Sequence, residues 1–154
     1  MIEFFVQGTP RPSGSKSAGA FTDKEGRTRT FVRDASGVKG KNWRQDIRAE
    51  AIGAFEDTPP IEGPIQVRLE FLFSRPLHHY QAGKRERPLK LDAPDYHTKA
   101  PDADKLSRSV LDALKGVAWK DDAQVARKLV IKRYMREIDR YEGVHVEISQ
   151  AVPR

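Results

Sequence analysis

The sequence predicts one α/β domain, of the α+β type, in which a mixed β-sheet is packed by two main helices. Short runs of alternating apolar residues indicate strands, and two longer runs with apolar residues every three or four positions indicate helices. The chain has 154 residues, which suits one hydrophobic core, so residues 1–154 are expected to form a single domain. The expected order is strand, hairpin, helix, strand, long loop, helix, strand, strand.

The amino-terminal segment predicts a strand, a loop and a hairpin. Ile2, Phe4 and Val6 alternate along the chain, as in a short strand that opens the core. An irregular basic loop is expected over about residues 8–20, because prolines, glycines and serines are frequent there. Residues 20–33 then predict a hairpin that turns at residues 24–26.

A first helix and a central strand follow. Apolar residues recur every four positions from Ser36 onward, which predicts an amphipathic helix that ends before the prolines at 59 and 60. These apolar residues are Trp43, Ile47, Ala51 and Phe55. The clearest strand is expected over residues 65–73, where every second residue is apolar.

The second half begins with a long irregular segment. Residues 74–101 contain four prolines and show no periodicity, and a loop of that length in a small domain is usually functional. A second helix is expected next, with Leu106, Val110, Ala113, Leu114 and Val117 on its apolar face. Residues 123–134 and 143–149 predict the last two strands.

The composition limits the classes of partner and of active site that the protein can have. Lys and Arg number 28 against 22 Asp and Glu, a net charge of +6, which favours a polyanionic partner: nucleic acid first, an anionic membrane surface second. No apolar run reaches the roughly 20 residues of a spanning helix, and the first ten residues lack a signal peptide pattern. The absence of cysteine excludes disulfides, thiolate zinc sites and a cysteine nucleophile, and suits the cytoplasm. No phosphate-loop spacing is present, so no nucleotide cofactor is expected.

Two acidic pairs flank the second helix. Asp102 and Asp104 stand at its start, and Asp121 and Asp122 lie shortly after its end. If the helix packs back on the strand that follows it, both pairs would return to one end of the sheet, where a hard divalent cation such as Mg²⁺ would neutralise them. The alternative stays open, because aspartate is also a favoured helix cap and a common turn residue.

The segment that holds these aspartates resembles the signature of the RusA family of Holliday-junction resolvases, common in phages and prophages. Three short motifs carry the resemblance: Pro-Asp-Ala-Asp-Lys-Leu at 101–106, Asp-Ala-Leu at 112–114 and Asp-Asp-Ala-Gln-Val at 121–125. The resemblance implies a homodimeric, Mg²⁺-dependent endodeoxyribonuclease, with Mn²⁺ as a substitute, that cuts four-way DNA junctions by symmetric nicks. It also implies that Asp102, Asp104 and Asp122 are the catalytic carboxylates that bind the metal, with Asp121 as a supporting neighbour.

Two positions depart from the family pattern. The family usually has asparagine where this chain has Lys105, and often has lysine where this chain has Arg108. Arg108 keeps the charge and binds phosphate as a fork, so a role in stabilising the transition state is expected for it, and Lys105 is expected to support the site or reach a phosphate.

Binding is expected to depend on the two irregular basic loops. The expected contacts to the DNA backbone are Arg11, Lys16, Lys84, Arg85 and Arg87, although solubilising charge is an equal alternative for each. Two other functions stay open. One is a non-catalytic protein of the same fold that binds junctions or other DNA, and the other is a nuclease for flaps or forks.

Overall fold

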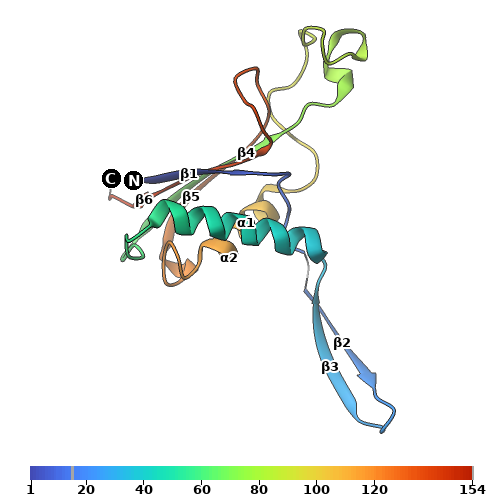
Figure 1. Ribbon diagram of the computed structural model, residues 1–154, viewed down its shortest axis with the longest axis vertical. Coiled ribbons are helices and arrows are strands. Elements are labelled where there is room, and N and C mark those ends of the chain that lie inside the picture. The colour runs from blue at the N-terminus through green and yellow to red at the C-terminus, as the bar shows by residue number, and fades with distance from the viewer. Residues whose placement is uncertain (15, 154) are drawn as a thin grey trace.

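A four-stranded mixed sheet forms the centre of the molecule (Figure 1). The computed structural model describes residues 1–14 and 16–153, with the side chains of residues 16, 17 and 34 outside that description. The strands β1 (Ile2–Gln7), β4 (Ile65–Phe73), β5 (Val125–Tyr134) and β6 (Gly143–Gln150) lie in the order β1-β6-β4-β5. β6 pairs antiparallel with β1 and β4, whereas β4 and β5 are parallel. The predicted mixed sheet is confirmed.

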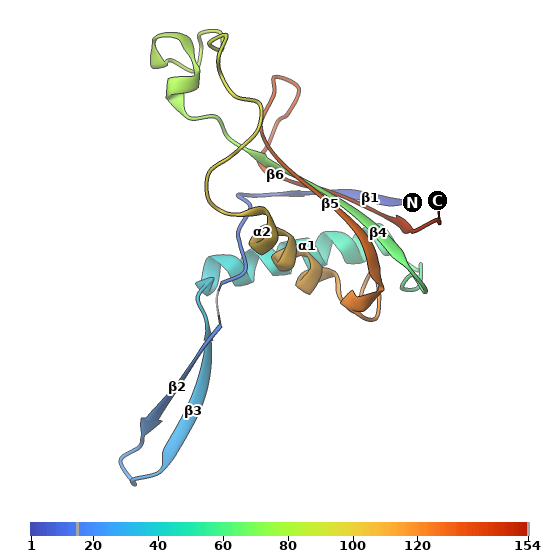
Figure 2. The same cartoon turned by 180° about the vertical axis from the view of Figure 1, so that it is seen from behind.

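Two helices, α1 (Gly37–Phe55) and α2 (Ala103–Leu114), cover one face of this sheet (Figures 1 and 2). The four apolar residues predicted for the first helix are all buried, as are the alternate residues of β4 from Ile65 to Phe73. Arg48 on α1 donates hydrogen bonds to the carbonyls of Ala113 and Lys115. These bonds give partners to carbonyl groups at the carboxyl end of α2. The two helices and the sheet therefore share one core. No helix in the described part of the chain is long and apolar enough to cross a bilayer.

The connection from β4 through α2 to β5 fixes where the acidic pairs lie. Because β4 and β5 are parallel, α2 has to run back along them from the carboxyl end to the amino end. The residues that precede α2 therefore lie at one end of β5, and those that follow it at the other. The expectation that both acidic pairs return to one end of the sheet is wrong for the single chain.

A hairpin of β2 (Lys16–Thr22) and β3 (Thr28–Asp34) projects from the body as a separate two-stranded sheet (Figures 1 and 2). The predicted turn is confirmed, but residues 16–20 form a strand where the sequence predicted an irregular loop. The backbone of this glycine- and serine-rich segment pairs with β3, with Ala18 opposite Val32, so the ladder outweighs its weak strand propensity.

The predicted irregular segment between β4 and α2 stands at the other end of the molecule from the hairpin (Figure 1). It contains two short 3₁₀ turns, η1 (Leu77–His79) and η2 (Gln81–Gly83), and a third, η3 (Asp122–Gln124), precedes β5. The end of the segment returns along β5, because Tyr134 N donates to the carbonyl of Asp95 at 2.8 Å and His97 N to that of Lys132 at 3.0 Å.

Candidate functional site

The start of α2 positions the first pair of carboxylates. Asp102 caps the helix, with its Oδ1 accepting a hydrogen bond from Lys105 N at 2.9 Å. Asp104 lies in the first turn, and its Oδ2 accepts from Arg108 Nη2 at 2.9 Å. The side chain of Asp104 is 68% exposed, so this i,i+4 ion pair is open to solvent and weak. Both carboxylates are therefore open to a ligand, and the capping role suggested by the sequence belongs to Asp102.

A pocket of about 800 Å³ surrounds Asp102. Three lysines line it together with this carboxylate: Lys99, Lys105 and Lys132. Lys132 Nζ donates to the carbonyl of Lys99 at 2.7 Å. Burial lowers the pKa of Lys132, and the nearby charge of Asp102 opposes that shift without cancelling it. A carboxylate among three amines suits a ligand that brings both phosphate and a cation.

Lys132 was missed by the sequence reasoning. It lies on β5 opposite Phe71 of β4. Lys128 lies four residues earlier on the same face of β5, and its Nζ donates to Ser107 Oγ of α2 at 3.0 Å. The signal was a pair of lysines spaced four apart in a strand, on the face that packs against helices. Alternation identifies that face only after the pairing with β4 is known.

The second acidic pair is held in a tightly bonded turn. Asp122 Oδ1 accepts from the indole Nε1 of the buried Trp119 at 2.7 Å. Asp121 Oδ1 accepts from Ala123 N at 2.8 Å, and this bond, helped by the charge of Lys115, lowers the pKa of Asp121. Gln124 completes the turn by accepting from the backbone N of Asp121 at 3.1 Å and by donating to the carbonyl of Ile61 at 3.0 Å. Asp121 therefore shapes the turn that presents Asp122.

The two acidic pairs stay apart in the single chain. The 12 residues of α2 separate them, a length of about 18 Å at 1.5 Å per residue. Within the residues that the structure describes, no group of three or more His, Asp or Glu side chains could hold a metal ion. One chain thus places Asp102 and Asp104 together, and Asp122 at the far end of the same helix.

The expected DNA contacts lie on different parts of the surface. Lys84, Arg85 and Arg87 are exposed on the segment after β4, where Arg85 lies over the ring of Tyr80 at 5.7 Å. Arg11 is half-buried. Burial raises the pKa of Glu142, but hydrogen bonds from Ser74 and Thr9 and the nearby charge of Arg11 together lower it. The side chain of Lys16 lies outside the described part of the structure.

A basic α+β domain that gathers lysines around a carboxylate has the residues of a protein that binds phosphate groups. Residues 6–149 match the family described as Endodeoxyribonuclease RusA, which is nearly the whole chain. The chain belongs to the RusA family of endodeoxyribonucleases, as the sequence motifs indicated. This family acts on Holliday-junction DNA, so membership implies nuclease activity. No curated protein matches the chain.

Proposed function

We propose that this protein is a Mg²⁺-dependent endonuclease that resolves four-way DNA junctions as a homodimer in the cytoplasm. Family membership supports nuclease activity, and one structural observation carries the more specific proposal. That observation is the pocket in which Asp102 lies among Lys99, Lys105 and Lys132, at the helix start that also carries Asp104. Lysines attract a DNA phosphate, and carboxylates provide the oxygen ligands that Mg²⁺ prefers.

The reaction is hydrolysis of a phosphodiester bond. Asp102 and Asp104 are the residues of one chain that would hold Mg²⁺ or Mn²⁺, and each has one carboxylate oxygen outside the hydrogen bonds described above. A bound ion would lower the pKa of its water and stabilise the charge on the leaving oxygen. Lys132 and Lys105 would hold the phosphate in the pocket, and Arg108 would exchange its ion pair with Asp104 for a phosphate oxygen.

Asp122 enters this proposal through a second copy of the chain. A symmetric four-way junction suits a two-fold protein with one active site in each half. Because Asp122 lies beyond the far end of α2, it does not join Asp102 and Asp104 within one chain. A homodimer in which one copy provides Asp122 to the other would assemble the carboxylates that the family resemblance implies.

A non-catalytic DNA-binding protein of the same fold is the second candidate. The ion pair between Arg108 and Asp104 favours it, because it engages one oxygen of a carboxylate that the nuclease needs. Lys105, in place of the asparagine that is usual in the family, favours it as well. A nuclease for flaps or forks would use the same residues and differs only in its substrate.

The deciding experiment is cleavage of an immobile four-way junction, with Mg²⁺ and with a chelator, beside matched linear duplex and fork substrates. The Asp104→Asn variant is compared with Asp112→Asn, an exposed aspartate later on the same helix. We expect paired nicks in the junction that need both Mg²⁺ and Asp104, while Asp104→Asn still binds the junction. Tight binding without cleavage in any divalent ion would assign the function to the second candidate. Preferred cleavage of forks would identify the third.

A further inference from the structure

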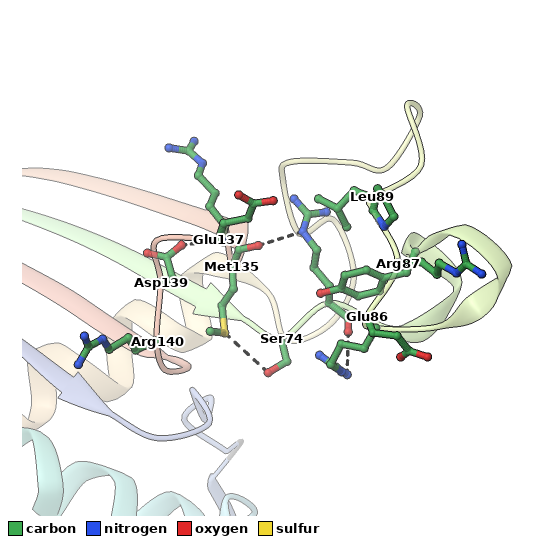
Figure 3. A pocket seen from close by; sticks show the side chains of 13 residues that line it. Ser74, Glu86, Arg87, Leu89, Met135, Glu137, Asp139 and Arg140 are labelled. Carbon is green, nitrogen blue, oxygen red and sulfur yellow. Dashed lines mark hydrogen bonds between the residues drawn. The ribbon is translucent and has the colours of Figure 1, made fainter.

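A cleft of about 700 Å³ lies between the irregular segment after β4 and the turn that joins β5 to β6 (Figure 3). Residues 74–75 form its floor, residues 80 and 85–89 one wall, and residues 135–137, 139 and 140 the other. Neither acidic pair of the candidate site lines it, so it is a separate feature of the surface.

A buried arginine holds the two walls together. Arg75 is only 4% exposed, and its Nε donates to the carbonyl of Met135 at 2.9 Å while its Nη1 donates to that of Pro94 at 2.7 Å. Arg85 Nη2 in turn donates to the carbonyl of Arg75 at 3.3 Å. The shape of the cleft is thus fixed by hydrogen bonds among its own walls.

The turn between β5 and β6 is also fixed from within. Arg133 is buried and donates from Nη1 to Asp139 Oδ2 at 2.6 Å, and the same oxygen accepts from Arg136 N at 2.7 Å. The charge of Asp139 is therefore compensated inside the turn, and the turn carries the side chains of Arg136 and Arg140 on its exposed side.

Three arginines of the cleft are uncommitted. Among the described residues, no hydrogen bond or ion pair engages the guanidinium of Arg87, Arg136 or Arg140, and only Glu86 and Glu137 oppose them as further acids in the lining. Figure 3 shows Arg140 and Arg87 on opposite sides of the cleft, with Ser74 and Met135 between them. Unpaired arginines on both sides suit a phosphate chain, since a guanidinium binds phosphate with two parallel hydrogen bonds.

The cleft lies near the pocket around Asp102. Lys132, near the end of β5, lines that pocket, and Met135, the first residue after β5, lines the cleft. One DNA strand can therefore pass both.

We propose that the cleft binds the phosphate backbone of the DNA strand that is cut, close to the scissile phosphate, with Arg136 and Arg140 on one side and Arg87 on the other. This inference rests on the proposed nuclease function and adds to it a binding site that the β5–β6 turn provides. A strand held at two points, in the pocket and in the cleft, would be aligned along the end of the sheet.

The test measures junction binding in the Asp104→Asn background, which prevents cleavage. The double change Arg136→Gln and Arg140→Gln is compared with Lys39→Gln and Lys41→Gln, which removes the same charge from exposed positions on α1. We expect the slope of log affinity against log salt to become shallower by about 3.6, because the homodimer loses four arginines, and the affinity at 0.1 M salt to fall ~10–100-fold. In a phosphate-ethylation interference experiment, signals at phosphates that flank the cut should disappear only in the arginine variant.

The outcomes separate this inference from the function on which it rests. Equal slopes and interference patterns for the two double variants, with normal junction binding and cleavage by the wild-type chain, would overturn the cleft proposal alone. A wild-type chain that neither binds nor cuts junctions would overturn both. Thermal unfolding of each variant shows whether a loss of affinity reflects a loss of fold.

Discussion

Lys132 places an amine on the face of β5 that packs against the helices, beside Asp102 and only partly buried. Its bond to the carbonyl of Lys99 is exposed to solvent, so the amine is accessible to a ligand. In the proposed nuclease, this amine would bind a DNA phosphate.

Replacement of Lys132 by methionine should reduce junction cleavage by about 100-fold, because one preorganised positive charge is removed from the phosphate. Lys132→Arg should retain most of the rate, since it keeps the charge. Lys128→Met is the matched control, four residues earlier on the same face. Single-turnover cleavage rates are the measurement. A wild-type rate for Lys132→Met would show that the amine has no role in the reaction.

Arg133 joins two carboxylates under the β5–β6 turn. It forms ion pairs with Asp139, at 2.6 Å, and with Glu70. Its hydrogen bonds lower the pKa of Asp139, and for Glu70 the bonds and charges of Arg133 and Arg68 outweigh the opposite effect of burial. Both carboxyls have a lower pKa in the folded chain than in the unfolded one. Their stabilising contribution is therefore present above about pH 4 and is lost as the pH falls through the folded values.

The free energy of unfolding should consequently fall between pH 6 and pH 3. Asp139→Asn should lose about 3 kcal/mol at pH 7, because it leaves Arg133 buried with one partner fewer, and should show a weaker dependence on pH. Asp46→Asn, at an exposed position of α1, is the control. Urea unfolding at several pH values measures both effects. The same pH slope for Asp139→Asn and the wild type would contradict this assignment.

The sequence predicted the helices and strands whose hydrophobic pattern lies within their own residues. α1 and β4 were predicted because Trp43, Ile47, Ala51 and Phe55 repeat every four positions and Ile65 to Phe73 alternate. The strand that begins at Lys16 was missed because its stability comes from pairing with β3 and not from its own residues. The relative place of the acidic pairs was also missed, since it depends on the parallel pairing of β4 and β5.

The β2–β3 hairpin depends little on the body of the protein. It forms its own two-stranded sheet, and Phe21 and Val32 are 51% and 70% exposed. In the strand register, the backbone of residue 16 lies opposite that of residue 34, so the two ends of the hairpin lie next to each other. A short connection can therefore replace it without moving the first strand or α1.

Replacement of residues 16–34 by a four-residue Gly-Ser linker should leave the core folded, with a melting temperature within a few degrees of the wild-type value. The measurement is thermal unfolding followed by circular dichroism, and junction affinity in the same variant reports what the hairpin contributes to binding. A control variant, Trp43→Ala, removes a buried side chain and should lose about 3–5 kcal/mol. A comparable loss on removing the hairpin would mean that it supports the core.

The aspartates that would bind the metal lie at opposite ends of the molecule's second helix, α2. The candidate metal ligands Asp102 and Asp104 lie at one end of α2 and Asp122 lies beyond the other, while Mg²⁺ binds its ligands at about 2.1 Å. Two copies related by a two-fold axis perpendicular to α2 would place each end of this helix in one chain beside the opposite end in the other. Each active site of such a dimer would contain carboxylates from both chains.

Mixed dimers of the Asp104→Asn and Asp122→Asn chains, carrying different tags and purified through both, test this arrangement. Each variant alone should be inactive. In the mixed dimer, one site combines both substitutions and the other combines the intact Asp104 of one chain with the intact Asp122 of the other, so one site should recover. We expect single nicks in a four-way junction where the wild-type dimer gives paired nicks. If each chain used only its own carboxylates, both sites of the mixed dimer would remain inactive and no nicks would form.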